Sequence, residues 1–406
     1  MSTGAKGNKA AGYIETEKRY YMQTVRRQPV VLAKGLGARV WDVDGKEYLD
    51  FTAGWAVNNL GHCHPAVVQA IQEQAATLTQ TSNQFYTLPQ LKLVELLVEH
   101  SAFDRVFLCN SGAEANEGAV KIGRKYGRLH RNGAFEVITA LNSFHGRTLN
   151  MVAATGQPHY QDPWKPLPPG FVHVEFGNFD AIVAATNDRT CAIMLEPVQG
   201  EAGVIIPSKE YMKKVRDWCT KNNLVLIYDE VQTGLGRLGT LFGYESFGVE
   251  PDVISLAKAL GNGIPVGAFL AKEKFAVLDF GDHGSTFGGN PLSTAAAYAA
   301  TKYIIDHDVP GHALKIGARL KAGLEGLKEY FPFIKQVRGM GMLIAVEFTE
   351  ELTPKLIGLT NDEGILVNPV RPNAIRIMPP LTLTAQEVDE GVARLKRAME
   401  RLSKVK

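Results

Sequence analysis

Two apolar runs of the sequence each lead into a residue that could do chemistry. The run 224–228, Leu-Val-Leu-Ile-Tyr, is followed by Asp229. The run 252–256 leads into Lys258 and a glycine-rich turn. Buried strands that deliver polar groups at their carboxyl ends are where α/β sheets place ligand chemistry. A carboxylate placed in this way could pair with a cationic ring, and a lysine could react with a carbonyl carbon. Pyridoxal phosphate (PLP) offers both, through a protonated pyridine and a Schiff base with lysine.

Each of these residues also has an ordinary structural explanation. A lysine after a strand can simply lie at the surface, and it is a poor nucleophile until burial or a neighbouring cation lowers its pKa. Asp229 and Glu230 can cap a helix or be solvated in a loop, although unpaired burial of a carboxylate is costly. The local sequence leaves both explanations open.

A small, polar turn follows the predicted strand 105–109. It opens a predicted helix, where backbone N–H groups and the helix dipole favour a phosphate. The candidate phosphate-binding residues are Ser111, Gly112 and Ala113. Ser285 and Thr286 precede a second such turn and support this interpretation. The alternative is an ordinary strand–helix turn.

Phe144 and Arg147 follow another predicted strand, at 135–140. The aromatic ring could stack on a cofactor ring, and the guanidinium could clamp a carboxylate through two hydrogen bonds. The alternative is a packed phenylalanine beside a solvated arginine.

Two other motifs predict no site. Residues 234–239 match G-x-G-x-x-G, but no helix start follows, as a dinucleotide site requires. The His-Cys-His run at 62–64 has no ligand pair at zinc-finger spacing, so we predict no metal site.

The composition of the 406 residues is ordinary, 45% hydrophobic and 21% charged, so a sizeable core is available. The formal net charge is +2 without a basic run, which argues against nucleic acid as a partner. We find no apolar stretch near the ~18 residues of a membrane helix and no signal core, so we expect neither membrane contact nor export. The four cysteines are widely spaced, which indicates reduced thiols in a cytoplasmic protein.

Alternating strands and helices from about 65 to 270 predict an α/β fold with a doubly wound, mostly parallel sheet. Residues 155–180, rich in Pro, Gly and aromatics, are predicted to be a long ordered loop. After about 290, long helices and short strands predict a second, smaller α+β domain. The predicted domains are an N-terminal segment that joins the small domain (1–60, with a loose tail at 1–12), a large PLP-binding domain (61–290) and the C-terminal small domain (291–406).

Together these segments resemble the class-III (ω-amino acid) aminotransferases, which are fold-type I PLP enzymes. The resemblance covers about residues 20–403. The motifs that carry it are LGHCHP (60–65), NSGAEANE (110–117), FHGRT (144–148), EPVQGE (196–201), DEVQTG (229–234), SLAKALG (255–261) and HGSTFGGNP (283–291).

The resemblance implies a role for each matching residue around the cofactor. Lys258 would form the Schiff base and shuttle the substrate proton, and Asp229 would pair with the pyridine nitrogen. The ring would lie between Val231 and Phe144, with Gln232 near its phenolic oxygen. The phosphate would be bound by Ser111, Gly112 and Ala113, and by Thr286 of the partner subunit in a homodimer with shared active sites.

The resemblance also implies a substrate site. Arg147 would hold a substrate carboxylate, and Ser285 of the partner subunit would contact the substrate. Arg376 would bind the α-carboxylate of 2-oxoglutarate, with Glu201 pairing it while the amino donor is bound. Trp55 departs from the family, where an aliphatic residue or a tyrosine is more usual, and an indole there would reshape the distal pocket.

The resemblance therefore implies transfer of a terminal amino group from an ω-amino donor to 2-oxoglutarate, giving a semialdehyde and glutamate. N-acetylornithine is the favoured donor, which implies arginine biosynthesis; 4-aminobutyrate, ornithine and other ω-amino acids are alternatives. A PLP aminomutase needs no second carboxylate site, so Arg376 and Glu201 argue against it. Intact Lys258 and Asp229 argue against a non-enzymatic binding relative.

Overall fold

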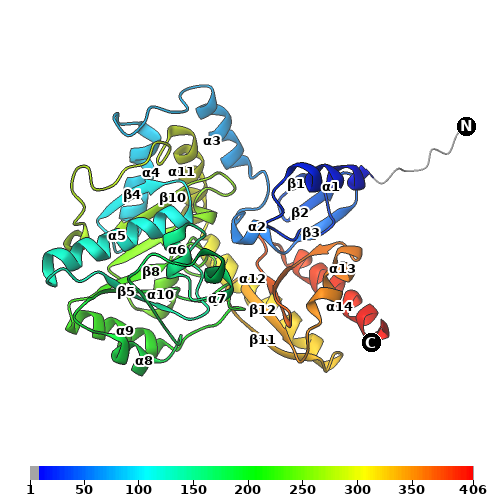
Figure 1. Ribbon diagram of the computed structural model, residues 1–406. Helices are drawn as coiled ribbons and strands as arrows, with labels where there is room; N and C mark the ends of the chain where they lie inside the picture. Colours follow the sequence, from blue (N-terminus) through cyan, green and yellow to red (C-terminus); the bar gives the residue numbers. More distant parts are fainter. Residues whose placement is uncertain (1–8, 406) are drawn as a thin grey trace, which may run out of the picture.

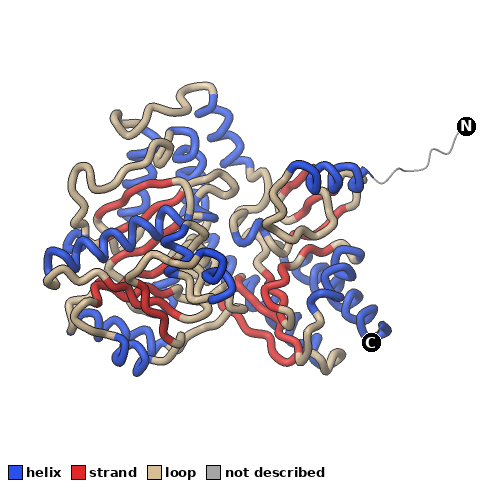
Figure 2. Tube along the Cα trace, in the orientation of Figure 1, coloured by secondary structure: helices blue, strands red, loops and turns tan. Residues whose placement is uncertain are grey.

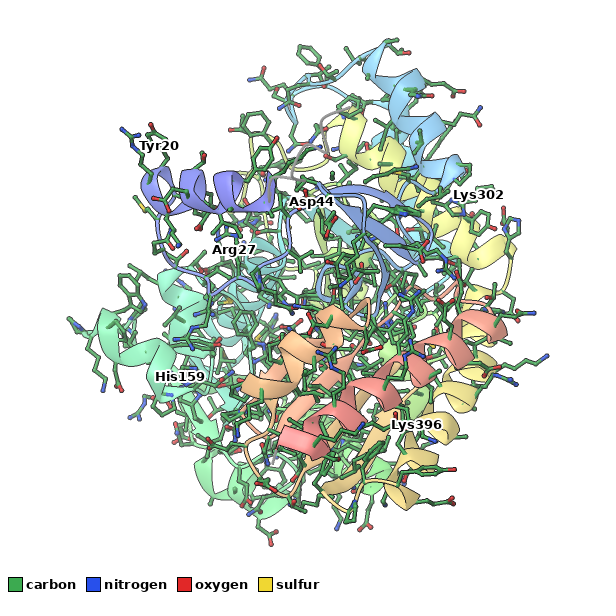
Figure 3. All side chains as sticks on the ribbon, turned by 90° about the vertical axis from the view of Figure 1, so that its right-hand side faces the viewer. Tyr20, Arg27, Asp44, His159, Lys302 and Lys396 are labelled. Atoms are coloured by element: carbon green, nitrogen blue, oxygen red, sulfur yellow. The ribbon has the colours of Figure 1, made fainter. Side chains whose placement is uncertain are left out.

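A computed structural model of the protein describes residues 9–405. The ribbon forms two lobes of unequal size, and the smaller lobe brings together the N-terminal strands and the C-terminal helices (Figure 1). Part of the predicted loose tail is helical, because α1 spans Lys9–Tyr20, and the rest of it lies outside the described residues. Viewed from the side of the smaller lobe, α1 runs along the outside with Tyr20 at its end (Figure 3).

The large lobe is built on one seven-stranded sheet. All neighbouring strands run parallel except β10, which is antiparallel to both β4 and β9. In spatial order the strands are β4 (Arg105–Cys109), β10 (Gly267–Ala271), β9 (Val253–Leu256), β8 (Val225–Asp229), β7 (Thr190–Leu195), β5 (Glu136–Ala140) and β6 (Phe171–Val174). The prediction of a mostly parallel α/β sheet is confirmed.

Helices cover both faces of this sheet, as the tube view shows by the helical segments around the strands (Figure 2). Val225 and Ile227 of β8 belong to an apolar cluster with Ile122 of α5 (Gly112–His130). The alternate residues Leu226 and Tyr228 belong to another cluster, which includes residues of α9 (Lys209–Lys221). Since neighbouring side chains of a strand point to opposite faces, β8 is buried on both sides. The other helices around this lobe are α3 (Pro65–Ala75), α4 (Leu88–Glu99), α6 (Leu149–Ala154), α7 (Pro158–Gln161), α8 (Phe179–Ala185), α10 (Gly243–Phe247) and α11 (Pro291–Asp306).

The smaller lobe holds two four-stranded sheets. One joins the ends of the chain, in the order β1 (Leu32–Leu36), β2 (Arg39–Asp42), β3 (Glu47–Asp50) and β13 (Ile365–Leu366). The other is antiparallel, in the order β11 (Ile334–Met340), β12 (Leu343–Phe348), β15 (Ala374–Ile377) and β14 (Asn368–Arg371). Its helices are α12 (Val309–Gly326), α13 (Thr353–Asp362) and α14 (Ala385–Val405).

The remaining short elements are α2 (Ala53–Ala56) and the 3-10 turns η1 (Asp162–Trp164), η2 (Lys258–Leu260), η3 (Glu273–Phe275) and η4 (Leu327–Glu329). The prediction of a loop over 155–180 is wrong in part, because this stretch contains α7, η1 and β6. Helix α11 packs on α3 and α4 of the large lobe. The domain boundaries at 60 and 290 stay a prediction. Within the described part of the chain, no helix combines the length and apolar character that crossing a membrane requires.

Candidate active site

Five parallel strands of the large sheet lead to one cavity of about 400 Å³. Carboxyl ends of parallel strands meet at the same edge of a sheet, so polar residues placed there converge. The lining residues delivered in this way are Ser111 after β4, Phe144 after β5, Glu196 after β7, Asp229 at the end of β8 and Lys258 after β9. The volume is that of a site for a small molecule.

Lys258 and Asp229 line this same cavity, as their strands predict. Strands β8 and β9 are neighbours, with Asp229 opposite Ser255, three residues before the lysine. Lys258 opens η2 in the left-handed region, at φ +44°, a conformation that costs energy for a residue with a side chain. Burial lowers the pKa of Lys258, and Arg376 lowers it further while Glu201 opposes the shift. The amine is therefore neutral more often than an exposed lysine.

The carboxylate of Asp229 is buried and fixed by four donors, of which Ser255 Oγ, 3.5 Å from Oδ1, makes the longest contact. Asn116 Nδ2 lies 2.7 Å from Oδ2, and His145 Nδ1 lies 2.8 Å from the same oxygen. The backbone N–H of Val231 donates to Oδ1 at 3.0 Å. Sequence analysis assigned no role to Asn116 or His145. Asn116 lies four residues after Gly112, which places both on one face of α5, and this spacing could have revealed it.

The start of α5 opens onto the cavity beside Ser111, Gly112 and Ala113. Ser111 caps the helix, its Oγ accepting from the backbone N–H of Glu114 at 3.2 Å. The first-turn N–H groups have no acceptor within the helix. A Cβ on Gly112 would lie 2.9 Å from Cγ1 of Val231, so only glycine keeps this approach open. These features fit the phosphate of PLP.

Gln232 carries a buried donor that is poorly satisfied. Its Oε1 accepts from Nη1 of Arg376 at 3.0 Å, whereas Nε2 makes no hydrogen bond of good geometry within the described structure, its neighbour being Glu201, whose pKa Gln232 helps to lower. Gln232 lines the cavity together with Val231 and Phe144. An unsatisfied buried N–H is costly, and an oxygen on a bound ring would satisfy it. The side chains at the cavity therefore fit PLP.

Arg376, on the smaller lobe, lies behind the cavity wall: it is not among the lining residues but contacts Glu201 and Gln232, which are. It lies on β15, its side chain is 1% exposed, and Nη2 lies 2.8 Å from Oε1 of Glu201. Asn368 accepts a further bond from Nη2 at 3.0 Å. Burial raises the pKa of Glu201, but Arg376 and Lys258 outweigh it and hold that pKa below its usual value. The predicted pair is thus in contact, and its role in substrate binding stays a prediction.

The structure brings Arg147 to the cavity but not Ser285, Thr286 or Trp55. Ser285 Oγ accepts from Nδ2 of Asn110 at 3.0 Å, and its neighbour Thr286 lies outside the lining of this chain's own cavity. Trp55 is 53% exposed.

Glu196 is a cavity residue that sequence analysis left without a role. Burial, with the charge of Asp229 adding to it, raises the pKa of Glu196 well above its usual value. Its Oε2 accepts from the backbone N–H of Phe144 at 3.2 Å. Glu196 therefore holds the segment that carries Phe144. Its position directly after an apolar run, like that of Asp229, was the available signal.

The two motifs set aside earlier make structural contacts. Nε2 of His62 lies 2.8 Å from Oδ2 of Asp50. Arg237, within 234–239, is fully buried and donates to the carbonyl oxygens of Met342 and Pro379 in the smaller lobe. After this motif, the first helix to begin is α10 at Gly243, so no helix starts at the motif itself, in line with the rejection of a dinucleotide site.

Comparison with known proteins agrees with this geometry. Residues 20–399 match the family aminotransferase class-III. The acetylornithine aminotransferase of Methanocaldococcus jannaschii is 48% identical over 398 residues, which cover 97% of this chain and 99% of that protein. A crystal structure of the ornithine aminotransferase from Toxoplasma gondii ME49 superposes with a TM-score of 0.94 at 34% identity, covering 99% of this chain and 97% of the other.

The acetylornithine aminotransferase from Elizabethkingia anophelis superposes with a TM-score of 0.87 at 33% identity, covering 97% and 99% of the two chains. The family match, the near-complete coverage and the fit of the cavity to PLP agree with one another. The chain belongs to the class-III aminotransferases and is a PLP-dependent aminotransferase.

Proposed function

We propose that this enzyme transfers the terminal amino group of N-acetylornithine to 2-oxoglutarate, giving the semialdehyde and glutamate. The names of the most similar curated relatives support this donor. So does the cation of Arg147 at the cavity, which suits a donor that carries a carboxylate away from the reacting amine. We also propose that the reaction belongs to arginine biosynthesis in the cytoplasm, which the names of the relatives and the four free cysteines support.

The contact between Glu201 and Arg376 is the observation that carries the proposal. The acceptor has an α-carboxylate beside its reacting carbon, whereas a terminal amine has none. A cation that binds the α-carboxylate of the acceptor must be neutralised while the amino donor is bound, because an unpaired buried charge is costly. Glu201, 2.8 Å from Arg376, is positioned to do this.

The residues around the cavity have distinct proposed roles in the chemistry. Bound PLP supplies an electron sink that makes the proton on the amino-bearing carbon removable. Lys258 Nζ, with its lowered pKa, takes and returns that proton. Asp229, oriented by Asn116 and His145, holds the proton on the pyridine nitrogen. The start of α5 would hold the phosphate, and Nε2 of Gln232 would donate to the phenolic oxygen.

The active enzyme is proposed to be a homodimer. Gln80 and Asn83 donate to the carbonyl oxygens of Thr286 and Ser285, so two distant segments form one surface. The two segments, 80–88 and 280–287, expose large apolar side chains, namely those of Phe85, Tyr86, Leu88, Phe280 and Phe287. Exposed apolar patches of this kind mark interaction sites. Pairing of two such surfaces would offer Thr286 of the partner subunit to the phosphate, and Ser285 of the partner subunit to the substrate.

Ornithine is the second candidate donor, because the Toxoplasma gondii neighbour is an ornithine aminotransferase. A panel of ω-amino donors at constant 2-oxoglutarate tests the choice. We expect kcat/KM for N-acetylornithine to exceed that for ornithine by about tenfold or more, since the acetyl group removes the α-ammonium charge whose burial would otherwise cost energy. We expect 4-aminobutyrate, which has no α-amino group to acetylate, to be a poorer donor as well. A higher value for ornithine would overturn the proposed donor. Isomerisation of an amino substrate without any acceptor would instead indicate an aminomutase.

A further inference from the structure

The guanidinium of Arg147 is held by aromatic rings. Its Cζ lies 3.8 Å from the ring centroid of Tyr160 and 5.3 Å from that of Phe144. The ion pairs formed within residues 9–405 include none to Arg147. Arg147 is exposed, so without these rings its long side chain would be free to sample many rotamers.

Stacking on a ring leaves the edge of a guanidinium available. The N–H groups of arginine lie in its plane, whereas the cation–π contact uses its face. A carboxylate can therefore bind two N–H groups side by side while Tyr160 covers the face. If an Asp or Glu side chain held Arg147 in place of the ring, its carboxylate would compete with the substrate for the same N–H groups.

Tyr160 is itself supported by the segment that carries Phe144. It lies on α7, and its backbone N–H donates to the carbonyl of Gln157 at 3.0 Å. Nε2 of the buried Gln157 donates to the carbonyl of Ser143 at 2.9 Å. The rings of Phe144 and Tyr160 meet edge to face, 6.0 Å apart. The preceding residue, His159, labelled in Figure 3, is exposed, so α7 lies at the surface.

We propose that Tyr160 is a positioning residue that makes the enzyme select amino donors with a distal carboxylate. It does so by holding the face of the Arg147 guanidinium, so that its N–H groups stay directed toward the cavity. The inference rests on the proposed binding of the donor carboxylate by Arg147.

The test compares Tyr160→Leu with Tyr160→Phe, which keeps the ring and is the matched control. We expect Tyr160→Leu to raise KM for N-acetylornithine about two- to fivefold with little change in kcat, the range that a cation–π contact at an exposed site supports. Tyr160→Phe should retain the KM of the wild type. The rate at which a simple alkylamine bleaches the cofactor absorbance should be the same in all three proteins. Tyr160→Met, which is unbranched and also lacks a ring, serves if the leucine variant fails to fold.

Arg147→Gln separates failure of this inference from failure of the proposed function. Equal effects of Tyr160→Leu on the carboxylate donor and the alkylamine, or an effect of Tyr160→Phe as large as that of Tyr160→Leu, would overturn the role of the ring. An unchanged donor KM in Arg147→Gln would overturn the proposed role of Arg147 itself. If both roles hold, adding Tyr160→Leu to Arg147→Gln should raise KM no further, because the two residues act through one contact.

Discussion

Replacing Glu201 by glutamine should make 2-oxoglutarate bind more tightly. In the free site, Arg376 is 1% exposed and pairs with Glu201 at 2.8 Å, while Gln232 and Asn368 supply neutral acceptors at 3.0 Å. An incoming α-carboxylate has to displace the Glu201 carboxylate. Glutamine keeps the size of the side chain but removes the competing charge.

The expected size follows from the burial of the pair. Exposed ion pairs contribute about 0–1 kcal/mol, and breaking a buried pair costs about 3–5 kcal/mol. Because Glu201 is 30% exposed and Arg376 is buried, we take about 1–2 kcal/mol for the displacement. This corresponds to a fall of about five- to thirtyfold in KM for 2-oxoglutarate. The donor should bind more weakly, since Arg376 then faces it without a neutralising charge.

The assay measures the donor and acceptor half-reactions separately. Only a Glu201 that neutralises Arg376 for the donor and leaves it for the acceptor predicts weaker donor binding together with tighter 2-oxoglutarate binding. The matched control is Glu210→Gln, which removes an exposed carboxylate paired with Lys214.

Arg376→Ala should raise KM for 2-oxoglutarate about a hundredfold, from the loss of two charge-assisted hydrogen bonds, and harm the donor half-reaction less. An unchanged or higher KM for 2-oxoglutarate in Glu201→Gln, or equal changes in both half-reactions, would refute the reasoning.

Three further predictions concern the cofactor site and the fold. Gly112→Val should weaken PLP binding by at least about tenfold in an absorbance titration, because the added Cβ would lie 2.9 Å from Cγ1 of Val231. Unchanged affinity would contradict the assignment of the phosphate site to the start of α5. Asp229→Asn should lower kcat by about a hundredfold or more while the fold persists, through loss of a fixed charge at the cofactor ring; near-normal kcat would contradict its role. Asp50→Asn should lower the free energy of unfolding by about 2 kcal/mol at pH 7, because Thr52 and His62 donate to this carboxylate. Burial raises the pKa of Asp50, but those bonds hold it below its usual value, so the stabilisation is present above about pH 4 and is lost as the pH falls further. A difference between wild type and Asp50→Asn that grows on acidification would contradict this.

The sequence predicted the strand ends well, because each carried a strong local signal. Apolar runs that finish in a charged or small polar residue identify both a buried strand and the group that it delivers. Asp229, Lys258 and the start of α5 accordingly meet at one cavity. The T-x-x-E spacing of Thr384 and Glu387 is likewise a local signal for a helix start, and the two form a capping box at α14, with the backbone N–H of Glu387 donating to Thr384 Oγ1 at 3.2 Å.

Elements that depend on distant neighbours were harder to predict. Strand β10 is rich in small residues of low strand propensity, and its place between β4 and β9 comes from packing. The short helix α2 has positive φ at Ala53, Gly54, Trp55 and Ala56. Such a left-handed turn costs about 1–2 kcal/mol for each residue with a side chain, so no local rule favours it. Its first residues are held by Asp50, whose Oδ1 accepts from the N–H of Ala53 at 3.0 Å.

In the candidate site, too, residues with a local sequence signal were predicted, whereas contacts between distant segments were not. The contact between Glu201 and Arg376 joins two lobes across the sequence, and only the resemblance to a known family indicated it. Tyr160 lies in a stretch that was predicted to be a loop, so its contact with Arg147 had no periodic pattern to reveal it. His145 lies between Phe144 and Arg147, which were both singled out, but its contact with Asp229 depends on how β5 and β8 are arranged in the sheet.

Covalent attachment of the cofactor to Lys258 can be measured directly. The holoenzyme is reduced with borohydride and digested, and the peptide that carries the cofactor is identified by mass spectrometry. We expect the reduced cofactor on Lys258, and no labelled peptide from Lys258→Ala treated in the same way. A cofactor attached to a different lysine of the wild-type protein, or labelling that survives in Lys258→Ala, would contradict the assignment of this cavity as the PLP site.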